Sequence, residues 1–186
     1  MSVDDQDNTL LSRIANGDKV AFGELLDRYL KPVIAFTRRY TTNYADADDI
    51  AQETFTQVWL KAADWQDQGT TALGWIYRIA YNRCIDLMRR TRRMVLVDEV
   101  EISQTGDDPA DQLADMASVT HIETCLKLLP ERQYTAIVLS AITGLSNKEA
   151  AGVMGLSVEA LESLLARGRK RLKELLLLNV KEEKVV

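Results

Sequence analysis

Apolar residues recur at helical spacing along the chain, and no stretch of the N-terminal half alternates apolar and polar positions for long enough to predict a sheet. Near the N-terminus the apolar positions lie three or four residues apart, as they do on one face of a helix. These positions are Leu10, Leu11, Ile14, Phe22, Leu25, Leu26, Tyr29, Leu30, Val33, Ile34 and Phe36. Pro32 falls inside this stretch, where we expect it to interrupt or kink a helix. The pattern predicts an all-α protein.

A further helix is predicted after the polar segment TTNYADADD. Its apolar positions can be buried together on one side. They are Ile50, Phe55, Val58 and Trp59. Asp49, Gln52 and Glu53 fall at i, i+3 and i+4, which places them together on the exposed side. This acidic and amide patch is either a solvated face or a contact for a partner protein.

The helix that begins near Ala72 has two unlike faces. At 100° per residue, one face gathers aromatic, amide and charged side chains within about 60° of Trp75. These are Trp75, Arg78, Asn82, Asp86, Arg89 and Arg93, opposite Ile76, Ala80, Cys84 and Leu87. Such a face suits single-stranded nucleic acid, because a ring stacks on a base while arginine neutralises phosphate. The alternative is a core tryptophan beside a solubilising basic face. The polar segment DWQDQGTTALG before it can form a loop that receives an extruded base.

Two short turns divide the C-terminal part of the chain into three predicted helices. The first helix ends at Gly144, and Ser146 with Glu149 has the spacing of a capping box that starts the second. The second helix stops at Gly155, and Ser157 can cap the third. A helix, a short glycine-containing turn and a second helix form the helix-turn-helix arrangement, whose second member lies in the major groove of DNA.

The third helix of this group separates a buried face from a polar one. Its apolar face carries Val158, Leu161, Leu165 and Leu172, and its opposite face carries Glu159, Ser163, Ala166, Arg167 and Lys170. Basic residues gather toward its end, where they favour the helix dipole and can meet phosphates. They are Arg169, Lys170, Arg171 and Lys173. The polar face is either a DNA-reading surface or an ordinary solvated face.

The formal net charge of −5 is distributed unevenly along the 186 residues. Residues 72–93 carry six arginines against the single acid Asp86, whereas residues 94–118 carry seven acids and no lysine or arginine. The acidic stretch contains Gly106 and Pro109 and has little helical periodicity, which predicts a linker between two domains. It is either a solvated spacer or an acidic strand that follows a basic nucleic-acid channel or mimics nucleic acid.

Composition narrows the class of protein. Hydrophobic residues make up 46% of the chain, enough for one good core or two small ones. The longest aliphatic run, 175–178, is too short to span a bilayer, and the acidic N-terminus has no apolar signal region. Cys84 and Cys125 have no CxxC or Cys/His neighbourhood, so we expect free thiols in a reducing cytoplasm. His121 is the only histidine, and we see no catalytic arrangement of nucleophile, base or phosphate loop around it, which argues against an enzyme.

Three motifs in order carry a family resemblance: DADDIAQETF, then WIYRIAYNRCIDLMRR, then, after the acidic linker, LPERQYTAIVLSAITGLSNKEAAGVMGLSVEALESLLARGRKRL. The chain resembles, over almost its whole length, bacterial RNA polymerase sigma factors of the extracytoplasmic-function group within the sigma-70 superfamily. The resemblance implies two small helical domains. Residues 1–94 would form a region 2-like domain, 95–118 the acidic linker, and 119–186 a region 4-like helix-turn-helix domain.

The resemblance also implies a role for each surface. The core-polymerase contact would comprise Asp46, Asp49, Gln52 and Glu53. The minus-ten promoter element would be melted and read by the loop 63–74 and by Trp75, Arg78, Asn82, Asp86, Arg89 and Arg90. The minus-thirty-five element would be read by Ser157, Glu159, Ser163, Arg167, Arg169 and Lys170. Glu162 and Leu164 stand where many members carry basic residues, which we interpret as altered specificity.

The implied partners are core RNA polymerase, promoter DNA and an anti-sigma factor. We expect no metal, no cofactor and no membrane insertion, and a cytoplasmic monomer when partners are absent. Two other interpretations stay open. One is a sigma-like decoy that binds an anti-sigma factor in place of DNA. The other is a stand-alone helix-turn-helix regulator, which would bind palindromic half-sites as a dimer and would leave the N-terminal half unexplained.

Overall fold

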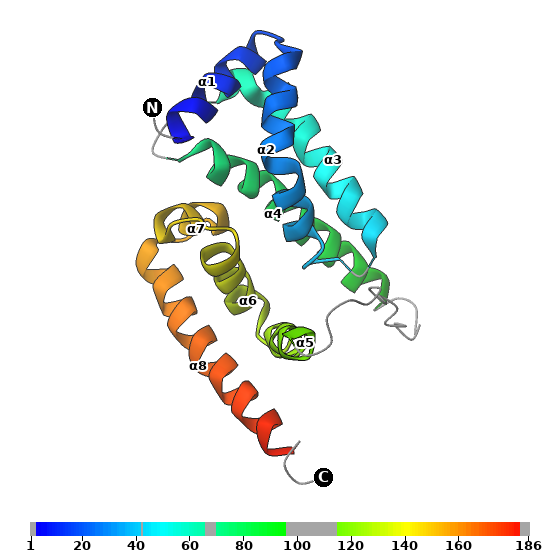
Figure 1. The fold of residues 1–186 in the computed structure, drawn as a ribbon, viewed down its shortest axis with the longest axis vertical. Coiled ribbons are helices and arrows are strands. Elements are labelled where there is room, and N and C mark those ends of the chain that lie inside the picture. Colours follow the sequence, from blue (N-terminus) through cyan, green and yellow to red (C-terminus); the bar gives the residue numbers. More distant parts are fainter. Residues whose placement is uncertain (1–2, 42, 66–69, 96–114, 183–186) are drawn as a thin grey trace. The chain divides into compact units, whose positions relative to one another are not determined.

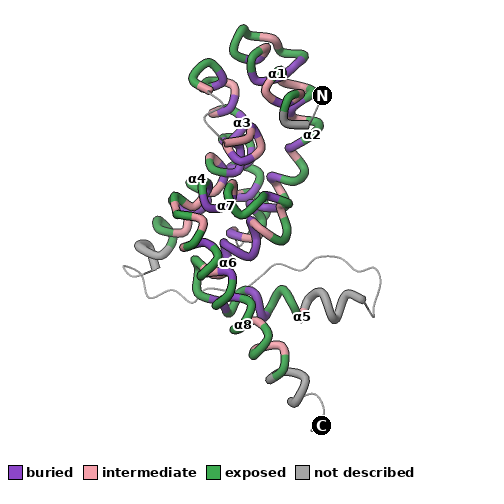
Figure 2. Tube along the Cα trace, turned by 90° about the vertical axis from the view of Figure 1, so that its left-hand side faces the viewer, coloured by how far each residue is buried: buried purple, intermediate pink, exposed green. Residues whose placement is uncertain are grey.

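The computed structural model describes residues 3–41, 43–65, 70–95 and 115–182. Within these ranges every regular element is a helix, which confirms the all-α prediction. The chain divides into two compact units, the first formed by residues 1–106 together with 152–154 and the second by residues 107–151 and 155–186. Buried, half-buried and exposed positions interchange along the helices of both units (Figure 2), as amphipathic helices require.

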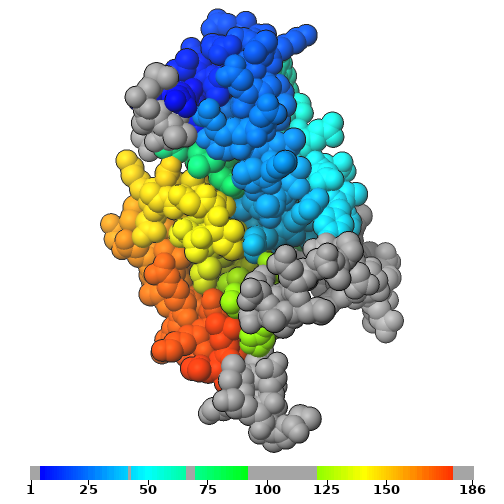
Figure 3. Space-filling model, viewed as in Figure 1, coloured from blue at the N-terminus to red at the C-terminus, as the bar shows by residue number. Residues whose placement is uncertain are grey.

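The first unit is a bundle of four helices, α1 (Val3–Ala15), α2 (Lys19–Thr37), α3 (Tyr44–Lys61) and α4 (Ala72–Val95), with the short 3₁₀ helix η1 (Ala62–Asp64) after α3. Each of the four packs against the other three, and α4 crosses α2 and α3 (Figure 1). On the surface drawn in Figure 3, α1 and α2 form the blue area and α3 the cyan area beside it. The core includes Leu11, Leu25, Val33, Val58 and Ile76, each with no exposed surface.

Local capping sets where the helices of this bundle start. The Asp18 carboxylate accepts hydrogen bonds from the amide of Ala21 at 3.1 Å, from the Arg13 guanidinium at 2.9 Å and from the amide of Val20 at 2.9 Å, and these bonds lower the pKa of Asp18. Asn43 caps α3 by accepting from the amide of Asp46 at 2.7 Å. The interruption expected at Pro32 is not found, because α2 runs through it. The last turns of α2 are held by packing, because Val33, Phe36 and Thr37, which follow the proline, are buried.

A buried carboxylate ties α1 to α2. Asp7 is 1% exposed and accepts hydrogen bonds from the Tyr29 hydroxyl and the Arg28 guanidinium. Burial and the bond to Asp7 raise the pKa of Tyr29. A buried carboxylate is tolerated only when it is paired, so this cluster fixes the position of α1 on the bundle.

The second unit contains α5 (Asp115–Lys127), α6 (Glu131–Ile137), the π-helical stretch η2 (Val138–Ile142), the larger part of α7 (Asn147–Met154) and α8 (Val158–Glu182). Helix α8 packs on α5 and α6. Gly168 of α8 is buried against α6, where a β-carbon would lie 3.0 Å from Cδ1 of Ile137 and 3.3 Å from Cβ of Gln133. The absence of a side chain at Gly168 therefore permits this close approach.

The helices extend into both ends of the predicted acidic linker. Helix α4 continues to Val95, and α5 begins at Asp115 instead of after Ser118. The linker boundaries were placed from the charge count, which does not register helical periodicity. The rest of the predicted acidic linker, residues 96–114, lies outside the described residues.

Candidate nucleic-acid interface

Helix α4 presents the two faces that its periodicity predicts. Ile76, Ala80 and Cys84 are buried in the bundle, and Leu87 is half-buried. The charged and amide side chains on the opposite face are exposed: Arg78, Asn82, Asp86, Arg89 and Arg90. The side chain of Arg93 lies outside the described residues. An exposed face with four arginine or amide side chains can meet both phosphates and base edges.

Trp75 stands at the start of this face and is half-buried. Its ring packs on that of Trp65, with centroids 5.2 Å apart and planes inclined by 39°. Trp75 is therefore neither a fully buried core residue nor an open stacking surface, because Trp65 covers one part of its ring. Trp65 was not among the predicted site residues, although it belongs to the polar segment that was predicted to form the loop. The loop residues 66–69 between the two rings lie outside the described residues.

The acidic and amide patch on α3 is exposed as predicted. Asp49, Gln52 and Glu53 are exposed side chains on the outer side of the helix, and Asp46 is half-buried in its first turn. Asp46 also accepts a hydrogen bond from the Asn43 side-chain amide at 2.9 Å. Three carboxylates on one side of α3 favour a partner that carries positive charge.

A cleft between α3 and α4 joins this patch to the face of α4. Its volume is about 170 Å³, and it is lined by Asp46, Asp49, Ile50, Glu53, Arg83, Asp86, Leu87 and Arg90. Within it, the Nη2 atom of Arg83 lies 3.0 Å from Oε1 of Glu53. The lining therefore contains residues assigned to both predicted surfaces. Arg83 was counted among the basic residues of this segment but was not predicted as a site residue.

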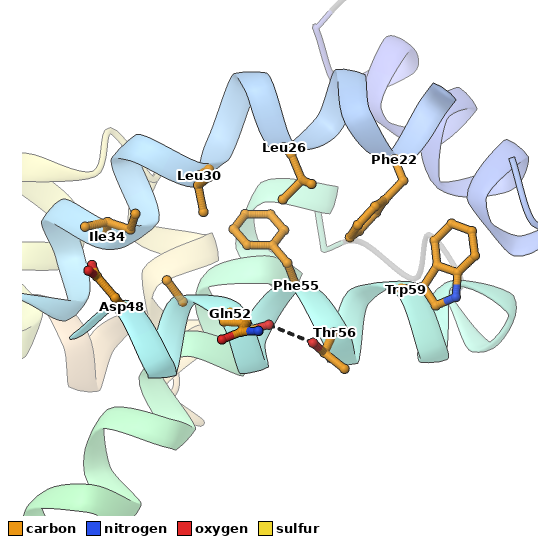
Figure 4. Close-up of a pocket in the computed structure, with 10 residues that line it drawn as sticks. Phe22, Leu26, Leu30, Ile34, Asp48, Gln52, Phe55, Thr56 and Trp59 are labelled. Atoms are coloured by element: carbon orange, nitrogen blue, oxygen red, sulfur yellow. Dashed lines mark hydrogen bonds between the residues drawn. The ribbon is translucent and has the colours of Figure 1, made fainter. Parts of the chain in front are cut away.

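An apolar groove runs between α2 and α3 on another side of the bundle (Figure 4). Its volume is about 430 Å³. Its apolar lining comprises Phe22, Leu26, Leu30 and Ile34 from α2 and Ala51, Phe55 and Trp59 from α3. The rings of Phe22 and Trp59 meet edge to face, with centroids 5.2 Å apart. The sequence predicted the α2 residues as apolar positions of a buried face, whereas the structure leaves these four half-buried.

The turns around α7 confirm the helix-turn-helix geometry. The amide of Ser146 donates to the Glu149 carboxylate at 2.8 Å, and the amide of Glu149 donates to the Ser146 hydroxyl at 3.3 Å, which is a capping box. Gly144 and Gly155 have φ angles of 75° and 64°, a conformation that favours glycine. The Ser157 hydroxyl accepts from the amide of Ala160 at 3.2 Å and so caps α8.

Helix α8 turns its polar face to solvent. Leu161 and Leu165 are buried, and Val158 and Leu172 are half-buried. The predicted reading residues are exposed: Ser157, Glu159, Ser163, Arg167, Arg169 and Lys170. Hydrogen bonds from its own amide and from Ser157 lower the pKa of Glu159. This charged carboxylate at the start of α8 can accept a hydrogen bond from a cytosine amine.

Other candidate chemistry is limited within the part of the chain that the structure describes. Cys84 and Cys125 are buried and are not joined in a disulfide, and burial raises the pKa of Cys84 to about 12. The expectation that neither has a histidine neighbour is wrong for Cys125, because its Sγ atom lies 3.9 Å from Nε2 of His121, one helical turn away. No group of three or more His, Cys, Asp or Glu side chains among the described residues is placed to hold a metal ion. None of the described helices is both long and apolar enough to cross a bilayer.

Comparisons with known proteins cover both units. Residues 25–94 match the family model for sigma-70 region 2, and residues 121–172 match a model for sigma-70 region 4. RNA polymerase sigma factor CnrH of Cupriavidus metallidurans is 32% identical, over 95% of this chain and 97% of that protein. The ECF RNA polymerase sigma factor SigW of Bacillus subtilis is 28% identical, over 88% and 93%.

Two solved structures resemble the fold closely. One is CnrH in complex with the cytosolic domain of CnrY, with a TM-score of 0.70 and 31% identity over 92% of this chain and 97% of that one. The other is the sigma factor RpoE in complex with the anti-sigma factor NepR from Bartonella quintana. It has a TM-score of 0.71 and 27% identity over 83% and 96%.

Proposed function

The chain belongs to the extracytoplasmic-function group of sigma-70 RNA polymerase sigma factors, and from this premise we propose how its surfaces divide the work of transcription initiation. As a transcription initiation factor it binds core RNA polymerase and directs it to promoters. The α3 patch contacts core polymerase, the outward face of α4 binds the minus-ten element, and the polar face of α8 binds the minus-thirty-five element. Residues 1–94 and 119–186 would form the two functional domains.

The exposed face of α4 carries this proposal. It lies within the stretch that matches region 2, and it combines a half-buried tryptophan with exposed Arg78, Asn82 and Arg89. Aromatic rings and arginines together suit a single strand whose bases have left the duplex. The α7–α8 geometry lies within the region 4 match and supports the assignment of α8 to duplex DNA.

In the proposed mechanism the chain performs no bond chemistry. It supplies sequence specificity to a core enzyme and converts binding energy into strand opening by capturing unpaired bases. Two weak DNA sites on one chain act as one strong site that is sensitive to their spacing, because the first contact raises the effective concentration of the second. A net charge of −5 fits this division, since core polymerase would supply most phosphate contacts.

An anti-sigma factor is the proposed regulatory partner. CnrH has been solved with the cytosolic domain of CnrY, and RpoE with the anti-sigma factor NepR. We expect a partner of this kind to cover the α3 patch and the polar face of α8, because covering either would prevent holoenzyme from recognising a promoter. The free chain would be a cytoplasmic monomer.

Run-off transcription tests the proposed function. Purified bacterial core polymerase transcribes fragmented genomic DNA with this protein, and core alone is the control. New start sites that share two spaced upstream elements would support the proposal and reveal the sequence that is read. Core binding without new starts would favour the decoy interpretation. Tight operator binding without any core binding would leave only the helix-turn-helix regulator.

A further inference from the structure

The ion pair between Glu53 and Arg83 connects two surfaces that we assign to different partners. Glu53 belongs to the proposed core-polymerase patch on α3, whereas Arg83 belongs to α4, whose outward face is the proposed DNA surface. Their side chains meet at 3.0 Å in the cleft between the helices. The same cleft is lined by Asp49 of the core patch and by Asp86 and Arg90 of the DNA set.

Arg83 stands at the edge of the DNA surface. It follows Asn82 directly and precedes Asp86 by three residues, so these side chains leave neighbouring parts of α4. Asn82 and Asp86 are exposed, whereas the side chain of Arg83 is only 32% exposed because Glu53 draws it into the cleft. Released from Glu53, the guanidinium can turn out beside Asn82, where a phosphate of a bound strand would lie.

The pair is weak enough to be exchanged. The Glu53 side chain is 49% exposed, and partly exposed ion pairs change an equilibrium by at most about five-fold. A cation of a docked partner can therefore take over the carboxylate without breaking the bundle. One carboxylate attracts each of two cations less strongly than it attracts a single cation. Once Glu53 pairs with a cation of the partner, its ion pair with Arg83 therefore becomes weaker.

We infer that Arg83 is a further promoter-contacting residue, which Glu53 withholds from DNA until core polymerase binds the α3 patch. The inference rests on the proposed function. Since binding energies are reciprocal, DNA bound through Arg83 would also free Glu53 and strengthen core binding by the same factor. Glu53 would thus keep Arg83 from DNA in the free chain, and Arg83 would contribute to DNA binding only in the holoenzyme.

The first test uses the full chain without polymerase. Fluorescence anisotropy measures its affinity for a labelled, mixed-sequence single-stranded DNA oligonucleotide over a series of salt concentrations. Glu53→Gln should tighten binding by about two- to five-fold and steepen the salt dependence by about 0.7, the value for one added phosphate contact. Asp49→Asn is the matched control, because it removes a charge from the same cleft without releasing Arg83.

The double variant separates released arginine from lost negative charge. With Arg83→Gln in place, Glu53→Gln should gain no more affinity than Asp49→Asn gives in the wild-type background. Equal gains from Glu53→Gln and Asp49→Asn, with Arg83 present, would overturn the inference. Unchanged far-UV circular dichroism in all variants shows that the helices are intact.

The variant Arg89→Gln distinguishes a failure of this inference from a failure of the proposed function. If it weakens oligonucleotide binding while Glu53→Gln has no specific effect, α4 binds DNA and only the role of Arg83 is wrong. If Arg89→Gln also has no effect, the assignment of α4 to DNA is wrong, and the inference is overturned with it.

The second test examines release by the polymerase. On a promoter fragment selected by run-off transcription, holoenzyme with Arg83→Gln should show a salt dependence of binding lower by about 0.7 to 0.9 than wild-type holoenzyme. The free chain should show no such difference between wild type and Arg83→Gln, because Arg83 is already paired with Glu53 there. Equal salt dependence in the two holoenzymes would overturn release by core polymerase.

Discussion

Replacing Gly168 by alanine should weaken the packing of α8 on α6. A β-carbon at this position would lie 3.0 Å from Cδ1 of Ile137 and 3.3 Å from Cβ of Gln133. The Ile137 methyl is the end of a flexible side chain and can swing away. The Gln133 β-carbon is attached to the α6 backbone, so relief there requires the two helices to separate by a few tenths of an ångström.

Gly152→Ala provides the matched comparison, because an added β-carbon there meets nothing within 4 Å. Both glycines lie in helices, where alanine is favoured over glycine by up to about 1 kcal/mol. Overpacking of a tight contact costs about 1 to 3 kcal/mol. Gly152→Ala should therefore stabilise the fold by up to about 1 kcal/mol, and Gly168→Ala should leave the second unit up to about 2 kcal/mol less stable than wild type.

Urea unfolding can assign this change to one unit. The three tryptophans, at positions 59, 65 and 75, all lie in the first unit, so their fluorescence follows that unit alone. Far-UV circular dichroism follows the helices of both. Gly168→Ala should lower the midpoint of the circular-dichroism component that fluorescence does not share, with the slope of free energy against urea unchanged.

The comparison between the two variants is the decisive quantity, because the gain in helix propensity is largely common to them. If the Gly168→Ala protein were as stable as the Gly152→Ala protein, a methyl group between α6 and α8 would cost no stability, and the expected overpacking would be refuted. A fluorescence midpoint that moved with Gly168→Ala would show that the change is not confined to the second unit.

Three further outcomes are expected. Asp49→Arg with Glu53→Arg should weaken core-polymerase affinity about ten-fold or more at unchanged helicity, and unchanged affinity in a binding titration would remove the α3 patch as a core contact. Burial raises the pKa of Tyr77 from 10.0 to about 12, so its unfolded form loses the proton first and stability falls as pH rises through this range. Tyr77→Phe should show a smaller fall in urea midpoint over that range; equal falls would contradict the assignment. Asp7→Asn should cost about 2 to 4 kcal/mol of unfolding free energy because the hydrogen bonds from Tyr29 and Arg28 weaken, whereas exposed Asp27→Asn should cost less than about 0.5 kcal/mol.

Local signals in the sequence were sufficient for much of this fold. The capping box of Ser146 and Glu149 involves residues three apart, so a short segment of the sequence is enough to predict its geometry. The two faces of α4 follow from the 100° rotation per residue, and the buried Cys84 and exposed Arg89 lie where that rotation predicts. The family resemblance supplied the order and roles of the two domains, which periodicity alone does not provide.

Features that depend on packing between helices were not predicted. Glu53 and Arg83 are thirty positions apart, and only the crossing of α3 and α4 brings them together. Asp7 was interpreted as part of an acidic terminus, because nothing in its local sequence indicates the hydroxyl and guanidinium that meet it. Gly168 gave no local signal either, since its small size matters only where α6 approaches.

The left-handed glycines at the two ends of α7 constrain how this segment can change over generations. Gly144 and Gly155 fix the length of the short helix, and each residue inserted in α7 would turn the start of α8 by about 100° about the axis of α7 and advance it by about 1.5 Å. Such a displacement would move α8 as a body and take Leu161 and Leu165 away from the core that they fill. This part of the chain therefore tolerates substitutions but not insertions or deletions. If α8 reads the promoter as we propose, a lineage would acquire a new promoter preference by exchanging side chains on α8 while the spacing of the turn stays fixed.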